Sequence, residues 1–117
     1  MTTPTEIRYD KTAKVLHVTF DDGESFALPA ELLRVESPSA EVQGHSPAQK
    51  QLVAGRRHVG IIGIEQIGHY AVKLTFDDLH DTGLYTWETL RRMGEEKDAL
   101  WRAYLDALSA AGLGRDP

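Results

Sequence analysis

An acidic turn with a single histidine, residues 77–81, carries the side chains best suited to chemistry in this chain. Asp77, Asp78 and Asp81 supply carboxylates, and His80 supplies an imidazole. Such oxygen and nitrogen ligands suit a divalent metal such as Zn²⁺, Mn²⁺ or Fe²⁺. The same residue types also form turns by hydrogen bonding to nearby backbone groups, and that simpler interpretation stands beside the metal site.

A metal site here needs a second histidine, because two histidines and one carboxylate are the minimum for a non-haem iron centre. His45 or His69 reaches the acidic turn only if the segment 36–57 folds back over it. The sequence shows no nucleophile–base set, phosphate-binding loop or complete metal motif, so residue chemistry alone predicts no reaction. We therefore expect no metal and no cofactor, with zinc or iron held by His80, Asp78 and His45 as the alternative.

Composition indicates a folded, acidic domain. The chain has 117 residues, of which 41% are hydrophobic, and a net charge of −5 at pH 7. This length predicts one domain over 1–117, with a core at about 6–94. The acidic balance argues against nucleic acid as a partner, and the absence of cysteine excludes disulfides and thiolate metal sites. No apolar run approaches the about 20 residues that span a bilayer, and no signal segment is visible, so we expect a cytoplasmic protein without membrane contact.

Alternating apolar residues predict strands on both sides of a long, irregular connection. The predicted strands lie at 6–9, 15–20, 25–28, 58–67 and 70–76. Residues 58–67 are apolar on both faces, which is typical of a central strand. Tyr70, Val72, Leu74 and Phe76 share one face of the last strand and are expected to be buried, together with the following Tyr85 and Trp87. The connection at 36–57 lacks periodicity and is long for a small domain, which favours a functional or mobile loop.

Helical signals precede and follow this pattern. Pro29 opens a helix of one or two turns that ends at Val35. Thr86 is predicted to cap a second helix that ends at Gly94. An apolar stripe in 95–111 predicts a longer C-terminal helix, which Gly112 ends; the stripe comprises Trp101, Tyr104, Leu105, Leu108 and Ala111. The predicted fold is α+β, a small antiparallel or mixed β-sheet of about five strands with a short helix and the C-terminal helices packed on it.

The segments LPAELLRVESPSAEVQGH (28–45) and VGIIGIEQIGHYAVKLTFDDLHDTGLYTW (59–87), with Leu90, together resemble a bacterial family. It is the gamma-butyrobetaine hydroxylase-like N-terminal domain family, also called DUF971, whose function is unknown. The resemblance covers about 16–90 of the chain. The combination of these motifs is much more specific than any one of them.

The resemblance implies a zinc site that this sequence does not retain. In full-length hydroxylases of this kind, the domain precedes an iron- and 2-oxoglutarate-dependent catalytic domain and holds a structural zinc through three cysteines and one histidine. The histidine matches His80, whereas the cysteine positions fall near Ser37, Ser39 and Val42. Hydroxyl and isopropyl groups do not replace thiolates as zinc ligands. Leu79 stands where the family usually has glycine, so we expect the acidic turn to differ from that of relatives.

These observations favour a non-enzymatic accessory or protein-interaction domain. Similar domains occur fused to iron–sulfur assembly ATPases, which suggests a partner in iron–sulfur or redox-enzyme assembly. One alternative is a metal-binding domain that uses His80 and nearby carboxylates, and another is a small-ligand pocket lined by Tyr70, Tyr85 and Trp87. We expect a binding surface where the loop meets the acidic turn, formed by Arg34, Ser37, Ser39, His45, Asp78, His80, Tyr85 and Trp87.

Overall fold

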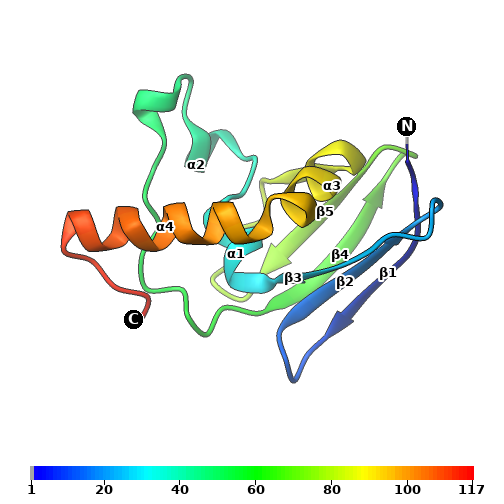
Figure 1. Cartoon of the computed structure of the whole chain (residues 1–117), viewed down its shortest axis with the longest axis horizontal. Helices are drawn as coiled ribbons and strands as arrows, with labels where there is room; N and C mark the ends of the chain where they lie inside the picture. Colours follow the sequence, from blue (N-terminus) through cyan, green and yellow to red (C-terminus); the bar gives the residue numbers. More distant parts are fainter. Residues whose placement is uncertain (1) are drawn as a thin grey trace.

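Two three-stranded antiparallel sheets and four α-helices make up the fold in the computed structural model, which describes residues 2–117 (Figure 1). The first sheet contains β1 (Pro4–Asp10), β2 (Val15–Phe20) and β3 (Ser25–Pro29), and the second contains β4 (Ile61–Ile67), β5 (Ala71–Phe76) and β6 (Leu84–Thr86). The helices are α1 (Ala30–Val35), α2 (Ala40–Gln43), the 3₁₀ turn η1 (Pro47–Gln49), α3 (Trp87–Glu95) and α4 (Lys97–Ala111). The α+β class is confirmed, but the strands form two sheets rather than one of about five.

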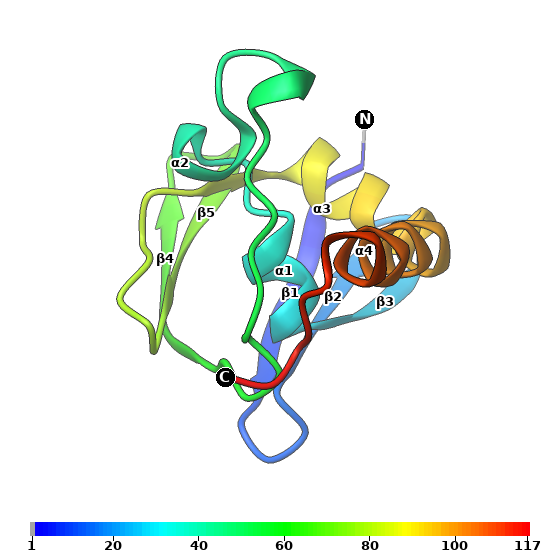
Figure 2. The ribbon, with the colours of Figure 1, turned by 90° about the vertical axis from the view of Figure 1, so that its left-hand side faces the viewer.

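The main core lies where the two sheets meet α1 and α3. In Figure 2, β4 and β5 lie to one side, β1, β2 and β3 lie to the other, and α1 lies between them. The strand parity expected from the sequence places Leu16, Val18 and Phe20 in this core, each at most 1% exposed. Leu32 and Leu33 of α1 join them with no exposure. The short helix thus contributes to a core that it shares with both sheets.

The strand predicted to be central, 58–67, is instead an edge strand. Within residues 2–117, β4 pairs with β5 alone, and Ile62 and Ile64 are 63% and 42% exposed. Ile62 is the extra residue of a β-bulge between Ile61 and Gly63, and a bulge turns a side chain out of its expected face. The continuous apolar run at 58–67 therefore does not indicate a strand that is buried on both faces.

Tyr70 is the other core residue predicted wrongly. It lies in the turn before β5, next to Gly68 with its positive φ of 54°, and its side chain is 53% exposed. Val72, Leu74, Phe76, Tyr85 and Trp87 are buried as expected, at 6% exposure or less. The alternating pattern was correct, but the strand begins one residue later.

Helix α3 begins at the expected cap and passes through the expected end. The Thr86 side chain accepts a hydrogen bond from Thr89 N, whereas Gly94 lies inside the helix. A Cβ at position 94 would lie 2.5 Å from Cδ1 of Phe26, so Gly94 permits α3 to pack closely on β3. Gly112 does end α4, with φ +70°. Of the predicted stripe on α4, Tyr104 and Leu108 are buried, but Leu105 is 38% exposed.

The connection at 36–57 folds into α2 and η1 and then runs beside α4 to the C-terminal segment. Gly55 N donates to Gly114 O, and Arg57 N donates to Arg115 O. The side chain of Arg115 binds both carboxylate oxygens of Glu31, at 2.7 and 2.9 Å. No helix in residues 2–117 combines the length and the apolar character needed to cross a membrane.

Candidate functional site

The start of the long connection lies against the acidic turn through two side-chain contacts. Ser37 Oγ lies 3.0 Å from His80 Nε2, and Ser39 Oγ lies 2.6 Å from Thr82 Oγ1. Ser37, Ser39 and His80 are 0%, 5% and 8% exposed. We call these four residues the latch. It joins two segments that are distant in sequence.

Local hydrogen bonds position each half of the latch. Ser39 caps α2 by accepting from Glu41 N, and Ser37 Oγ accepts from Ser39 N. On the other side, Asp78 Oδ1 accepts from His80 N at 3.1 Å, which shapes the turn around the imidazole. Serine and aspartate favour such side-chain-to-backbone bonds, so both segments present their polar side chains in fixed directions.

The carboxylate of Asp78 also accepts hydrogen bonds from two arginines. Arg34 Nε and Arg56 Nε both donate to Asp78 Oδ2 at 2.7 Å. Burial alone raises the pKa of Asp78, but the hydrogen bonds from Arg34, His80 N and Arg56 outweigh it and lower that pKa. The Arg34 side chain is 10% exposed, and its Nη1 is buried without a hydrogen-bond partner among residues 2–117. One carboxylate thus faces two guanidinium groups.

A hollow of about 340 Å³ opens beside this cluster. Arg56, Asp78 and the neighbouring His58 contribute to its wall; the full lining is Gly55, Arg56, His58, Val59, Asp77, Asp78 and Pro117. The carboxylate of Asp77 accepts from Gly60 N at 3.0 Å and is therefore already engaged in the fold. The 32% exposed Arg56 is the most accessible charge in the cluster of Arg34, Arg56 and Asp78.

His80 is held in its neutral form. Burial lowers the pKa of His80 below its ordinary value of 6.5, and the nearby charge of Arg34 lowers it further, whereas Glu41, Asp78 and Asp81 act in the opposite direction. The unfolded chain therefore takes up the proton at a higher pH than the folded chain does. Stability from this residue is present above about pH 6.5 and is lost as the pH falls toward the lowered pKa.

We therefore expect the melting temperature to fall between about pH 7 and pH 5, and the His80→Gln variant to show a shallower fall over that range. Thermal denaturation of both proteins in a series of buffers measures the two slopes. Identical slopes would mean that His80 titrates in the same way in the folded and unfolded chains.

The site does not fit a zinc or iron ion. Both His80 ring nitrogens have neighbours, with Ser37 Oγ at Nε2 and Glu41 Oε2 at 3.3 Å from Nδ1, and Asp78 is taken by two arginines. No group of three or more histidine, cysteine, aspartate or glutamate side chains in the described chain could hold a metal ion. Hydroxyl groups at positions 37 and 39 are poor zinc ligands.

Ser37 contacts His80, and His80 contacts Glu41, which is the arrangement of side chains in a hydrolase triad. These residues are nevertheless not placed for catalysis. A nucleophilic hydroxyl must reach the substrate, and Ser37 is fully buried. Its Oγ also accepts from Ser39 N and is closely packed against Gly83, where a Cβ would lie only 2.5 Å away. The arrangement is a structural contact in this conformation.

The remaining predicted site residues lie elsewhere. His45 is exposed on the loop, where its backbone N donates to Gln49 Oε1, and no hydrogen bond or ion pair among residues 2–117 links its side chain to the latch. Tyr85 is fully buried and donates to Leu33 O. Trp87 Nε1 donates to His69 O at 2.7 Å. The predicted ligand pocket of Tyr70, Tyr85 and Trp87 is wrong, because Tyr70 is largely exposed whereas Tyr85 is enclosed.

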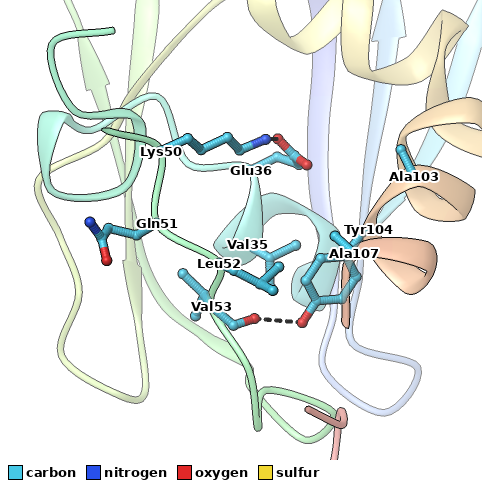
Figure 3. A pocket seen from close by; sticks show the side chains of 9 residues that line it. All are labelled: Val35, Glu36, Lys50, Gln51, Leu52, Val53, Ala103, Tyr104 and Ala107. Carbon is cyan, nitrogen blue, oxygen red and sulfur yellow. Dashed lines mark hydrogen bonds and ion pairs between the residues drawn. The ribbon is translucent and has the colours of Figure 1, made fainter. Parts of the chain in front are cut away.

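A second hollow, of about 220 Å³, separates residues 50–53 from α4 (Figure 3). Its wall is mainly apolar, with Val35, Leu52 and Tyr104 facing one another. The polar groups at its rim are already paired: Lys50 Nζ with Glu36 Oε2 at 2.6 Å, and Tyr104 OH with Val53 O at 2.6 Å. It is smaller than a typical small-molecule site of about 300 Å³ or more. We interpret it as the joint between the loop and the helix.

Leu79 occupies the tip of the acidic turn at φ +70° and is 77% exposed. The turn thus has the conformation that glycine favours, although we had expected leucine to change it. Leu79→Gly is expected to stabilise the fold by about 1 kcal/mol, because the left-handed conformation is strained for leucine. Urea denaturation measures the change; a destabilised variant would mean that Leu79 contributes packing that its exposure does not suggest.

Comparison with known proteins identifies the family. The family model for the gamma-butyrobetaine hydroxylase-like N-terminal domain matches residues 7–91. The chain belongs to this family. Two proteins with NMR solution structures cover all of this chain: one is 48% identical with a TM-score of 0.87, covering 92% of that protein, and the other is 44% identical with a TM-score of 0.86, covering 87%.

A crystal structure from Acidithiobacillus ferrooxidans ATCC 23270 extends the comparison. That protein of unknown function, a DUF971 family member, is 41% identical with a TM-score of 0.67, and the match covers 79% of this chain and 92% of that one. No curated protein matches the sequence. The comparisons therefore establish the family and leave its function open.

The sequence pointed to Arg34, Ser37, Ser39, Asp78 and His80, and the structure brings these five residues together. It places most of them inside the fold rather than on a surface. Sequence reasoning did not include three others: Arg56, Glu41 and Thr82. The pairing of Arg56 with Asp78 is not visible from sequence spacing.

Proposed function

We propose that this is a non-enzymatic accessory domain that binds an acidic segment of a protein partner at Arg56, beside the buried Arg34. The observation that carries the proposal is the sharing of one carboxylate, Asp78, by two arginines, of which Arg56 is 32% exposed. An additional carboxylate from a partner would balance the second positive charge. Arginine suits this role because its planar guanidinium group binds carboxylates in a fixed geometry.

The hollow beside Arg56 supports this proposal. It gives a partner side chain room to approach Arg56 and His58 without opening the latch. The cluster of Arg34, Arg56 and Asp78 carries one excess positive charge on a chain whose net charge is −5, and this local excess favours an acidic segment. An iron–sulfur or redox-enzyme assembly factor remains the partner class suggested by the resemblance, and a cytoplasmic location remains a prediction from the sequence.

The Arg56→Gln variant is expected to lose the partner while remaining folded. The ion pair of Arg56 with Asp78 is partly exposed, and Asp78 keeps its bond to Arg34 in the variant, so the expected loss of stability is about 1 kcal/mol. Arg92→Gln is the matched control, because Arg92 is also a surface arginine with one weak ion pair, 3.9 Å from Glu96. Wild type, Arg56→Gln and Arg92→Gln are used in parallel as baits in native lysate, and the recovered proteins are quantified. A partner recovered equally by wild type and Arg56→Gln would contradict the proposal.

Elemental analysis of the same preparations addresses the metal-binding alternative. We expect no stoichiometric zinc or iron, and a melting temperature that is unchanged by a chelator, since no metal-binding energy would be linked to folding. One metal per chain that is lost in His80→Ala would favour the alternative.

For the partner-binding test, Arg34→Ala is unsuitable as a first variant, because removing a buried charge partner destabilises a fold by about 3–5 kcal/mol.

A further inference from the structure

The two sheets present unpaired edges to a common groove. Sheet pairing leaves the outer edge of β1 and the outer edge of β4 without a neighbouring strand among residues 2–117. A groove of about 330 Å³ lies between them at one end of the sheets. The start of β1 forms one wall, with Pro4, Glu6 and Ile7, and Gln66 lies in the other wall. Val72 and Trp87 belong to the core and give the groove an apolar floor.

Beyond this groove, a tyrosine links the other ends of β1 and β4. Ile61 N, at the start of β4, donates to the hydroxyl of Tyr9, near the end of β1, at 3.0 Å. The start of β1 lines the groove together with Gln66, near the end of β4. The edges of β1 and β4 therefore run in opposite directions. They are linked by the side chain of Tyr9 and not by a ladder of backbone hydrogen bonds.

We propose that this groove binds an extended peptide segment of another protein as an added strand between β1 and β4. Strands in a sheet lie about 4.8 Å apart and satisfy their backbone groups through neighbours. The inserted segment would be parallel to one edge and antiparallel to the other, and it would join the two sheets into one. Strand addition of this kind takes its affinity from backbone hydrogen bonds and its specificity from alternating side chains.

The groove also indicates the side chains of that segment. Ile7, Val72 and Trp87 provide apolar contacts on the core side, and Glu6 is the acidic group in the lining. An alternating apolar and basic segment would fit this surface. Pro4 has no N–H, and both edges carry a bulge, so the regular edges are short and the paired segment spans about four residues. This site is separate from the arginine site and has the opposite charge preference.

A blocked, fluorescently labelled hexapeptide of alternating valine and lysine is the probe. Fluorescence anisotropy with the full chain is expected to show saturable binding, and amide hydrogen exchange is expected to slow in β1 and β4. The same peptide methylated at alternate backbone nitrogens is expected to lose binding, because it keeps its side chains but can no longer donate to one of the two edges, where the methyl groups also block close approach. A peptide of alternating valine and glutamate is expected to bind about fivefold or more weakly, since it faces Glu6 with like charge.

Glu6→Lys is expected to weaken binding of the valine–lysine peptide about fivefold, while Glu24→Lys, an exposed change in the β2–β3 turn, leaves it unchanged. Melting temperatures of both variants establish that they are folded. Three results would each overturn the proposal: no saturable binding of the valine–lysine peptide, equal binding of its methylated form, or protection confined to residues outside β1 and β4. Loss of partner capture in Arg56→Gln leaves this result unaffected.

Discussion

Replacing Trp87 with alanine is expected to lower the free energy of unfolding by about 3–5 kcal/mol. Trp87 is 6% exposed, belongs to the main core and donates its indole N–H to His69 O at 2.7 Å. Alanine removes both the packing and the donor, and it leaves a cavity at the start of α3. Equilibrium denaturation in urea measures the loss.

Trp101 provides the matched control, because it is the other tryptophan in the chain and is only partly buried. Trp101→Ala is expected to cost less than half as much. Trp87→Phe keeps most of the apolar area but loses the indole donor. The lost hydrogen bond is expected to cost about 1 kcal/mol, in addition to the small loss of packing. A loss below about 1 kcal/mol in Trp87→Ala would show that the assignment of this residue to the core is wrong.

Gly83→Ala is expected to destabilise the fold by about 1–3 kcal/mol, although glycine-to-alanine changes often stabilise proteins. A Cβ at position 83 would lie 2.5 Å from Ser37 Oγ and 3.3 Å from Tyr85 Cε1. Both neighbours are fully buried and have little room to move. Urea denaturation gives the stability, and amide exchange shows whether residues 37–43 separate from the acidic turn.

The double variant Ser37→Gly with Gly83→Ala tests the cause. Removing the serine side chain opens space for the added methyl group, so the effect of Gly83→Ala should be smaller in this background. Additive losses would locate the strain elsewhere in the turn. Because Ser37→Gly also removes the contact with His80, the comparison is made against Ser37→Gly alone.

Strand parity was readable from the sequence, whereas strand neighbours were not. Alternation placed Val72, Leu74 and Phe76 on the buried face, because side chains of a strand point to opposite faces in turn. Alternation does not report which strands pair, so 58–67 was assigned to the centre of a single sheet. The exposure of Ile62 arises from a bulge, which depends on the partner strand as well as on local sequence.

The candidate site was predictable in its members but not in its environment. Turn-forming residues and the family motifs pointed to Ser37, Asp78 and His80. A serine that caps a helix on the surface and a serine buried against a histidine have the same local sequence pattern, so burial was not evident. Arg56 was missed because its contact with Asp78 depends on how the whole loop returns. The role of these residues in binding a partner stays a prediction.

The way the loop at 36–57 is attached has a consequence for chain entropy. Ser37 contacts His80, Gln51 N donates to Val42 O, and Gly55 N donates to Gly114 O, so the long connection is divided into short closed segments. Closing a loop costs only about 0.6 kcal/mol more for each doubling of its length. The exposed tip at 45–50 could therefore accept several inserted residues at little cost, which makes it a suitable place for an internal affinity tag that leaves both the latch and the sheet edges untouched.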